Sequence, residues 1–305
     1  MGRIADALKR AEQERSVSVA ESIGHIGMQT AEPVGIASVT VPHPPPTDDE
    51  ANEPEPRVAV VGGLSESLIP FFEPSSLVTE QYRSLRTRLL SQNPNYEHKV
   101  IAITSAVPKE GKSVTTLNLG CVLAEIRHLK ILVVDGDFRR SSLARMLDQN
   151  DGPGLADVLS GDAKYEDVIR DTPIKNLKFI SAGRTRHRSA AELLTAATAS
   201  PSFRRMRNEF HYTFVDTPPA TTVTDVGIIG QMCSGVIVIV RLHRTHDGAA
   251  RRAVRLLQVN NIPIIGCMVV GRDSPADRYG YGNGYYYYNY YRYNDYIKKP
   301  GGKRK

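Results

Sequence analysis

Tryptophan is absent from this 305-residue chain, and cysteine occurs only three times. Cys121, Cys233 and Cys267 each lie within an apolar stretch, and an odd number at such positions predicts buried thiols in a reducing compartment. The spacing of the Cys and His residues matches no metal-binding motif. There is no run of about 18 apolar residues of the kind that spans a bilayer. The stretch Met1–Arg10 lacks the apolar core of a secretion signal.

Charge is distributed unevenly along the chain. The formal net charge is +6, and residues 272–305 carry eight Lys or Arg against three Asp, which is +5 of that total. The remaining residues are therefore nearly neutral, at +1. A uniformly basic protein would favour nucleic acid as a partner, whereas a basic tail on a nearly neutral body does not. We therefore expect no nucleic-acid partner.

The first quarter of the sequence has little capacity for a core. Residues 1–15 place Ile4, Leu8 and Ala11 at helical spacing, which predicts a short amphipathic helix that docks on a partner or a membrane, or an ordinary surface helix. Seven of the 19 prolines then fall between residues 33 and 56. We interpret residues 16–75 as a disordered linker, with order resuming near Leu77, because such a composition cannot bury enough apolar surface to fold.

Residues 104–113 combine a glycine, a lysine and a serine between an apolar strand-like run and a helix-like run. Strand, loop and helix is the context of a phosphate-binding loop, in which backbone N–H groups at the helix start face an anion. Gly111 would allow close approach of the backbone, Lys112 would reach the β- and γ-phosphates, and Ser113 would bind Mg²⁺. Ala106 replaces the first glycine of the usual motif, so a chance Gly-Lys-Ser turn is the alternative. The predicted nucleotide-binding residues are Ala106, Pro108, Lys109, Glu110, Gly111, Lys112, Ser113 and Val114.

Apolar runs alternate with helical patterns over residues 76–271, which we take as one catalytic domain. The predicted strands cover residues 100–103, 130–134, 177–181, 212–215, 235–240 and 264–270. Continuous apolar runs indicate strands that are buried on both faces, as in parallel sheets. The sequence therefore predicts an α/β fold with a doubly wound, mostly parallel sheet of the P-loop NTPase type.

Carboxylates follow two of these strands. Asp135 and Asp137 end the second strand, and Asp216 ends the fourth. Because ligands bind at the carboxyl ends of parallel strands, we expect the three side chains to converge on the phosphate loop. A single such Asp could simply cap a helix, but two strands that end this way beside a phosphate loop favour a site.

The proposed chemistry follows from the needs of a triphosphate, which are charge neutralisation and positioning. Mg²⁺ requires hard oxygen ligands, and Ser113, Asp137 and Asp216 are the predicted metal ligands. Asp135 is the predicted base that accepts a proton from an attacking hydroxyl, and Lys112 and Asp137 complete the catalytic set. The assignment among the three aspartates stays open at this point.

The C-terminal tail, residues 272–305, is rich in tyrosine, glycine and asparagine, a composition that cannot build a core and predicts flexibility. Its tyrosines are Tyr279, Tyr281, Tyr285, Tyr286, Tyr287, Tyr288, Tyr290, Tyr291, Tyr293 and Tyr296.

Together these motifs resemble the bacterial tyrosine autokinases of polysaccharide synthesis and export. Residues 106–113 are similar to that family's Walker A motif, Val133–Arg139 to its additional Walker A′ motif, and Phe214–Pro219 to its Walker B motif. The resemblance implies ATP and Mg²⁺ as cofactors and the ten tail tyrosines as sites of autophosphorylation. At 270–272, where relatives often place an Asn near the adenine, this chain has Val-Gly-Arg.

The same resemblance implies assembly. Glu80, Arg83 and Arg86 match the family's E-x-x-R-x-x-R helix, which implies self-association into a ring-like homo-oligomer and transfer between copies. The N-terminal stretch resembles stand-alone members, which are cytoplasmic and whose membrane part is a separate chain. That implies recruitment to the inner face of the membrane and activation by the cytoplasmic segment of a chain-length or export protein.

The sequence also permits two other interpretations. A partitioning-type P-loop ATPase, acting as a switch without kinase activity, shares the fold but typically has Lys directly after the first motif position, where this chain has Val107. A nucleic-acid-binding or phase-forming protein could use the Tyr- and Arg-containing tail to stack on bases, but the carboxylates and the phosphate loop would then have no role.

Overall fold

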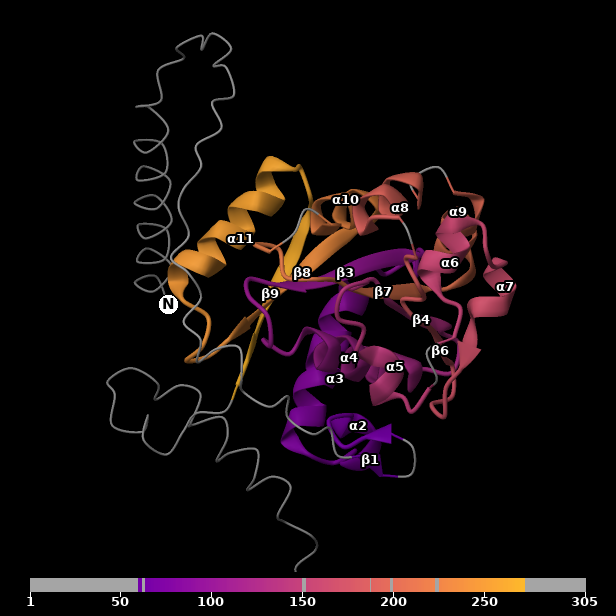
Figure 1. Ribbon diagram of the computed structural model, residues 1–305. Coiled ribbons are helices and arrows are strands. Elements are labelled where there is room, and N and C mark those ends of the chain that lie inside the picture. Colours follow the sequence, from indigo (N-terminus) through magenta and orange to yellow (C-terminus); the bar gives the residue numbers. More distant parts are fainter. Residues whose placement is uncertain are drawn as a thin grey trace, which may run out of the picture. The chain divides into compact units, whose positions relative to one another are not determined.

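The structure, a computed structural model, describes residues 60–61, 64–149, 152–186, 188–197, 200–222 and 225–271 (Figure 1). The helix expected at residues 1–15, most of the linker expected at 16–75 and the tail at 272–305 lie outside these residues. The fold below is therefore that of the central domain.

Seven strands form one sheet in the order β5-β6-β4-β7-β3-β8-β9. They are β3 (Lys99–Ser105), β4 (Ile131–Asp135), β5 (Arg170–Asp171), β6 (Leu177–Ile180), β7 (Tyr212–Asp216), β8 (Gly235–Arg241) and β9 (Ile264–Val270). All pairings are parallel except that of β5 with β6. The parallel, doubly wound prediction is confirmed, and its six strands all form; the short antiparallel β5 was not foreseen.

Helices cover both faces of the sheet (Figure 1). They are α2 (Ile69–Phe72), α3 (Leu77–Ser91), α4 (Lys112–Ala124), α5 (Leu143–Met146), α6 (Leu155–Ser160), α7 (Tyr165–Val168), α8 (Ala190–Ala197), α9 (Pro201–Glu209), α10 (Asp225–Met232) and α11 (Asp247–Val259). Within β3, Ile101 and Ile103 pack on the side of α3 and α4, while Val100 and Ala102 face α10 and α11. The alternation explains why the strand is apolar throughout, since each face meets its own core.

Order begins earlier than the sequence predicted. A small antiparallel pair, β1 (Val60–Val61) with β2 (Leu64–Ser65), precedes α2. Leu64 and Leu68 are buried in the core shared with α3 and α4, and Asn118 Nδ2 donates to Ser67 O at 2.9 Å. The expected restart at Leu77 is therefore too late. Leu64, Leu68 and the partly buried Phe72 anchor this segment, and these are too few apolar positions to give a helix or strand period in the sequence.

The cysteine expectation holds for only part of the set. Cys121 is buried in α4, and Cys233 is partly buried, but Cys267 is exposed on β9. Cys267 differs because β9 is the last strand of the sheet, so one side of it has no neighbouring strand among the described residues. All three cysteines carry free thiols.

Candidate active site

Three neighbouring strands bring the predicted site residues to one edge of the sheet. Strand β7 lies between β4 and β3, and Asp135 at the end of β4 is paired in register with Asp216 at the end of β7. The loop after β3 runs into α4, whose first residues are Lys112 and Ser113. The convergence predicted from the sequence is therefore present, because parallel strands end at the same edge.

A chain of hydroxyls links the phosphate loop to the Walker B aspartate. Ser113 Oγ donates to Asp216 Oδ2 at 2.5 Å, and Ser142 Oγ donates to Ser113 Oγ at 2.9 Å. Asp216 is 1% exposed, and its second oxygen, Oδ1, is buried with no hydrogen-bond partner among the described residues. A buried carboxylate oxygen without a donor is costly. Asp216 thus has a free acceptor beside the serine that starts α4.

Asp135 is held mainly by its own loop. Its Oδ2 accepts from Ser141 Oγ at 2.9 Å and from the backbone N–H groups of Ser142 and Leu143, both at 3.2 Å. Its Oδ1 accepts only one bond, from Asp137 N at 3.2 Å. One oxygen is therefore saturated with donors, and the other keeps a lone pair for a further proton.

Asp137 shapes the turn that follows. Its Oδ1 accepts from the backbone N–H groups of Arg139 and Arg140, at 3.2 and 3.0 Å. The Arg139 guanidinium in turn lies 3.4 Å from Asp225 Oδ2 at the start of α10. Asp137 is 7% exposed, against 0% for Asp135, so it is the more accessible of the two.

Burial dominates the electrostatics of the paired aspartates. It raises the pKa of Asp135, an effect that hydrogen bonds from Ser141 and the loop partly offset. It also raises the pKa of Asp216, and the neighbouring Asp135 charge raises it further, while Lys112 and the Ser113 hydrogen bond lower it. Two carboxylates that lie this close together and are shielded from solvent repel each other when both are ionised. The site therefore favours a bound cation.

The phosphate loop has the backbone form that its glycine predicts. Gly111 has φ +92°, and Lys109 is also left-handed at φ +63°. The end of β9 lies next to this loop, since a Cβ on Gly111 would meet Val270 Cγ2 at 3.8 Å. Residues 270–271, which depart from the family's Asn, thus adjoin the proposed nucleotide site.

Glu110 braces the loop through its side chain. The residue is 0% exposed, and its Oε2 accepts from Val107 N at 2.9 Å. Its other oxygen accepts from the Thr245 hydroxyl in the loop after β8. Arg241 Nη1 adds a bond to Lys109 O at 3.0 Å. Glu110 was grouped with the nucleotide-binding residues, and the structure gives its carboxylate this internal role.

Close approach of β4 and β7 depends on Gly136. Its N–H donates to Asp216 O at 2.8 Å, and a Cβ at this position would lie 2.8 Å from that same oxygen. Real side chains do not fit at such a distance, so only glycine allows the two acidic strand ends to meet.

These features fit a nucleoside triphosphate with Mg²⁺. The loop provides Gly111, whose backbone is in the left-handed conformation, and Lys112, which is only 8% exposed. Ser113 Oγ and the unpartnered Asp216 Oδ1 are hard oxygen donors of the kind that Mg²⁺ takes. Asp137 lies at the same edge of the sheet. The residues present therefore match the cofactors expected from the sequence.

Ser141 and Ser142, which contact Asp135 and Ser113, were not among the residues predicted from the sequence. Their position two and three residues after the Walker A′ arginine was the available signal. By contrast, the ten tail tyrosines lie outside the described residues, so the structure does not place them.

The predicted self-association helix is α3. Its Glu80, Arg83 and Arg86 form an ionic cluster with Glu125, the residue that follows α4. Arg83 contacts Glu125 through two nitrogens, at 3.1 and 2.7 Å, and Arg86 Nη1 donates to Glu125 Oε2 at 2.5 Å. The cluster is partly exposed, and within one copy it joins α3 to the helix that begins at the phosphate loop.

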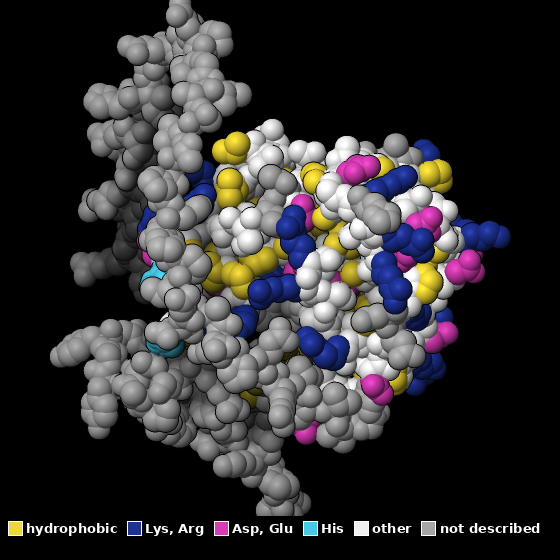
Figure 2. Space-filling model, in the orientation of Figure 1, with side chains coloured by type: hydrophobic (Ala, Val, Ile, Leu, Met, Phe, Trp, Pro, Cys, Tyr) yellow, Lys and Arg dark blue, Asp and Glu magenta, His cyan; other side chains and the backbone are white. Residues whose placement is uncertain are grey.

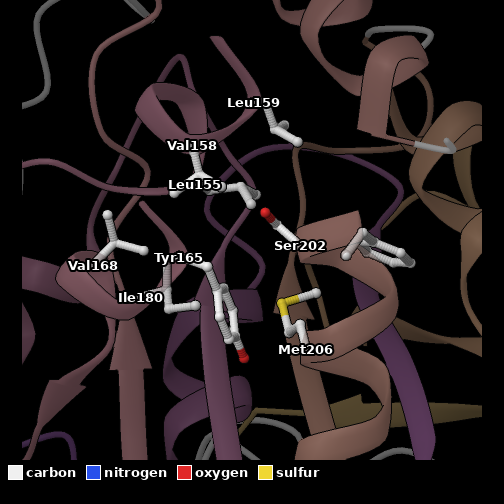
Figure 3. A pocket seen from close by; sticks show the side chains of 9 residues that line it. Leu155, Val158, Leu159, Tyr165, Val168, Ile180, Ser202 and Met206 are labelled. Atoms are coloured by element: carbon white, nitrogen blue, oxygen red, sulfur yellow. The ribbon is translucent and has the colours of Figure 1, made fainter. Parts of the chain in front are cut away.

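A small hollow elsewhere is apolar. Leu155, Tyr165 and Met206 line it, between α6, α7 and α9 (Figure 3). The Tyr165 hydroxyl is buried and has no hydrogen-bond partner within the described part of the chain, and burial raises its pKa. None of the site residues that the structure describes lines this hollow, so we assign it to the core.

Comparison with known proteins identifies relatives of this chain. Residues 98–259 match a family model described as an AAA domain. The EpsB protein of Ralstonia nicotianae is 31% identical over 224 residues, which cover 73% of this chain but 29% of that protein. The tyrosine-protein kinase CpsD of Streptococcus agalactiae is 30% identical over 208 residues, 67% of this chain and 89% of CpsD.

A solved structure, the BceF tyrosine kinase domain, is 31% identical, with a TM-score of 0.59 over 67% of this chain and 81% of that domain. The family match spans more than half of the chain, and it includes the strands and loops that carry Lys112, Asp135 and Asp216. This chain therefore belongs to the bacterial tyrosine-protein kinases, a family built on an AAA-type P-loop domain.

Proposed function

We propose that the chain is an autokinase that transfers the γ-phosphoryl group of ATP to the tail tyrosines of a neighbouring copy, within a ring-like homo-oligomer. The observation that carries this is the meeting of Ser113, Asp135 and Asp216 at one edge of the sheet. Following the family resemblance, we place this activity in the control of polysaccharide synthesis and export.

Each residue has a role that its geometry supports. Bound ATP supplies the phosphoryl group, and Mg²⁺ supplies two positive charges that offset those of the phosphates. Lys112 would stabilise charge on the transferred group, and Ser113, Asp137 and Asp216 would hold the metal. Asp135 accepts the tyrosine proton at Oδ1, the oxygen with only one donor. The tyrosine oxygen bonds to the γ-phosphorus as the bond between that phosphorus and the bridging oxygen breaks, and ADP leaves with the electron pair of the broken bond.

The point at which the tail begins supports access to such a site. Strand β9 ends at Val270, beside the phosphate loop, and 34 residues follow from 272 to 305. A chain of that length reaches at most about 110 Å when extended, which is enough to enter an adjacent copy. The partly exposed cluster of Glu80, Arg83 and Arg86 on α3 is the surface that we propose for self-association.

Membrane recruitment is part of the same proposal. Among the helices of the described residues, none has the length and apolarity needed to cross a bilayer. We propose that a separate membrane protein of chain-length control or export brings the kinase to the inner face of the membrane. Its cytoplasmic segment would act as the activator.

A mixing experiment tests the transfer between copies. One variant carries Lys112→Met with an intact tail, and the second is otherwise wild type with all ten tail tyrosines changed to Phe. Neither should incorporate label from ATP alone, but the mixture should phosphorylate the tail of the Lys112→Met chain. Label on no tyrosine, with release of free phosphate, would instead support an ATPase switch. Purified activator segments can be added to both arms.

A further inference from the structure

Five arginines gather on the surface formed by α11 and the turn before it. Arg241, Arg244, Arg251, Arg252 and Arg255 are all exposed, and we call this set the arginine face. The same stretch, residues 241–259, contains one acidic residue, Asp247, so its net charge is +4. In the space-filling view, dark-blue and yellow side chains lie next to each other over α11 (Figure 2).

The helix presents these residues on the side away from the core. Ala253 and Leu257 are buried against the sheet, at 0% and 2% exposure. With 3.6 residues per turn, Arg251, Arg252 and Arg255 fall within about 100° of one another on the opposite side. Arg251 pairs with Asp247 at 2.8 Å, but both side chains are 77% exposed, so this pair is weak and exchangeable.

Apolar surface adjoins the charge. Leu256 and Val259 of α11 are 37% and 73% exposed. Arg252 and Leu256 also line a hollow between α10 and α11, together with Val226 and Asn260. A ligand that carries an anionic group on an aromatic ring could bind the arginines through the anion and pack its ring on the apolar side chains.

The chain leaves the domain at the edge of this face. Leu242 N donates to Val270 O at 2.8 Å, and a Cβ on Gly271 would meet Leu242 Cβ at 3.1 Å. The first tail tyrosine, Tyr279, comes eight residues after Gly271. Eight residues span up to about 26 Å, whereas α11 is about 20 Å long. The tyrosines can therefore reach the whole arginine face of their own chain.

The charge of the tail determines whether its tyrosines bind the arginine face. The unmodified tail carries +5 and is repelled by the +4 face. Each phosphotyrosine adds about −1.5 to −2, so about three modifications cancel the charge of the tail and further ones reverse it. Guanidinium groups bind phosphate through paired hydrogen bonds, which are stronger than neutral ones.

We propose that the arginine face is a binding site for the phosphotyrosines of the chain's own tail. The unmodified tail is free to enter a neighbouring copy, and the multiply phosphorylated tail is retained on α11. This rests on the proposed function for the source of the phosphate, but the binding site itself does not require kinase activity.

The test uses synthetic tail peptides of residues 272–305 with zero, two or four phosphotyrosines. The protein is the full chain with its ten tail tyrosines changed to Phe, so that no internal phosphotyrosine competes. Binding is measured by fluorescence anisotropy at two salt concentrations. The test variant adds Arg251→Gln, Arg252→Gln and Arg255→Gln. A charge-matched control adds Arg88→Gln, Arg127→Gln and Lys130→Gln, which are exposed positions outside the arginine face.

We expect the four-phosphate peptide to bind and the unmodified peptide not to bind. The test variant should lose roughly tenfold or more in affinity, and the control less than about twofold. Equal losses in both variants, or no dependence on phosphate number, would overturn the proposal. So would a test variant that keeps phosphopeptide binding but loses binding to phosphatidylserine vesicles, because the face would then be a membrane surface. Autophosphorylation of the wild-type chain, followed by mass spectrometry, reports separately on the proposed function.

Discussion

Asp216 is placed where an ordinary stable fold would avoid a carboxylate. It is buried, one oxygen has no donor among the described residues, and Asp135 lies beside it. Burial and the neighbouring charge both raise its pKa, so its ionised form is disfavoured in the folded protein without a cation. A residue that costs stability and faces a phosphate loop is best explained by function.

Substituting Asp216→Asn should therefore separate activity from stability. Autophosphorylation should fall by about 10²–10³-fold, because a proposed metal ligand is lost. The free energy of unfolding at pH 7 should rise by roughly 1–3 kcal/mol, because a raised carboxyl pKa means that ionisation opposes folding. Label incorporation and urea unfolding measure the two effects. Asp171→Asn, at an exposed position, is the control, and a loss of stability in Asp216→Asn would contradict this account.

Glu110 offers a second test at this scale. Glu110→Ala removes the acceptor for Val107 N and for the Thr245 hydroxyl, which leaves a partly buried N–H group without its partner. We expect the dissociation constant for a fluorescent ADP to rise by about tenfold, since a loosened loop binds phosphate less well. Thr245→Val removes the bond to Glu110 and the acceptor for Arg241 N, but it leaves the bond between Glu110 and Val107 N intact. It should therefore produce a smaller effect in the same direction. If Glu110→Ala binds like wild type, the bracing role is wrong.

At the scale of elements, the contact between β4 and β7 determines the spacing of the acidic strand ends. Gly136→Ala would place a methyl group 2.8 Å from the backbone oxygen of Asp216 and 2.9 Å from Val215 Cγ1, so something must shift to admit it. We expect a loss of about 1–3 kcal/mol in stability by urea unfolding, as for overpacked cores, and reduced phosphorylation. Gly161→Ala is the control for a glycine substitution without steric overlap, because a Cβ at that position meets nothing within 4 Å. Its own left-handed φ gives it a cost of about 1 kcal/mol.

The cluster of α3 and Glu125 predicts a pH dependence. Burial alone would raise the Glu125 pKa, but hydrogen bonds from Arg83 and Arg86 outweigh it and lower the pKa. A lowered carboxyl pKa contributes stability above the unfolded value of about 4.3, and that contribution is lost as the pH falls through the folded pKa. Glu125→Ala should thus cost about 1 kcal/mol at pH 7 and little near pH 3, as measured by urea unfolding. An equal cost at both values would show that packing is responsible.

For the whole molecule, we propose that the charge of the tail controls assembly. Multiple phosphotyrosines reverse the +5 of residues 272–305, and we expect this to weaken association between copies. With ATP and Mg²⁺, light scattering should show wild type dispersing, while the variant with ten Phe substitutions stays assembled. Tyr96→Phe, an exposed tyrosine outside the tail, should behave like wild type. If the ten-Phe variant disperses as readily as wild type, tail charge is not the control.

The sequence by itself determined the local chemistry. Gly111, Lys112 and Ser113 are adjacent in the chain, so the sequence shows them as one motif at the start of a helix. The apolar runs before Asp135 and Asp216 likewise identify buried parallel strands from consecutive residues. Ser141 and Ser142 were missed because hydroxyls are common in loops and carry no periodic pattern.

Only the tertiary structure decided which parts meet. The insertion of β7 between β3 and β4 joins Asp216 to Ser113 and Asp135. The packing of α3 on α4 brings Arg83 and Arg86 to Glu125, and the pairing of β8 with β9 starts the tail beside the arginine face. Strand order and helix packing minimise the exposed area of the whole core, and that free energy depends on contacts between residues far apart in the chain.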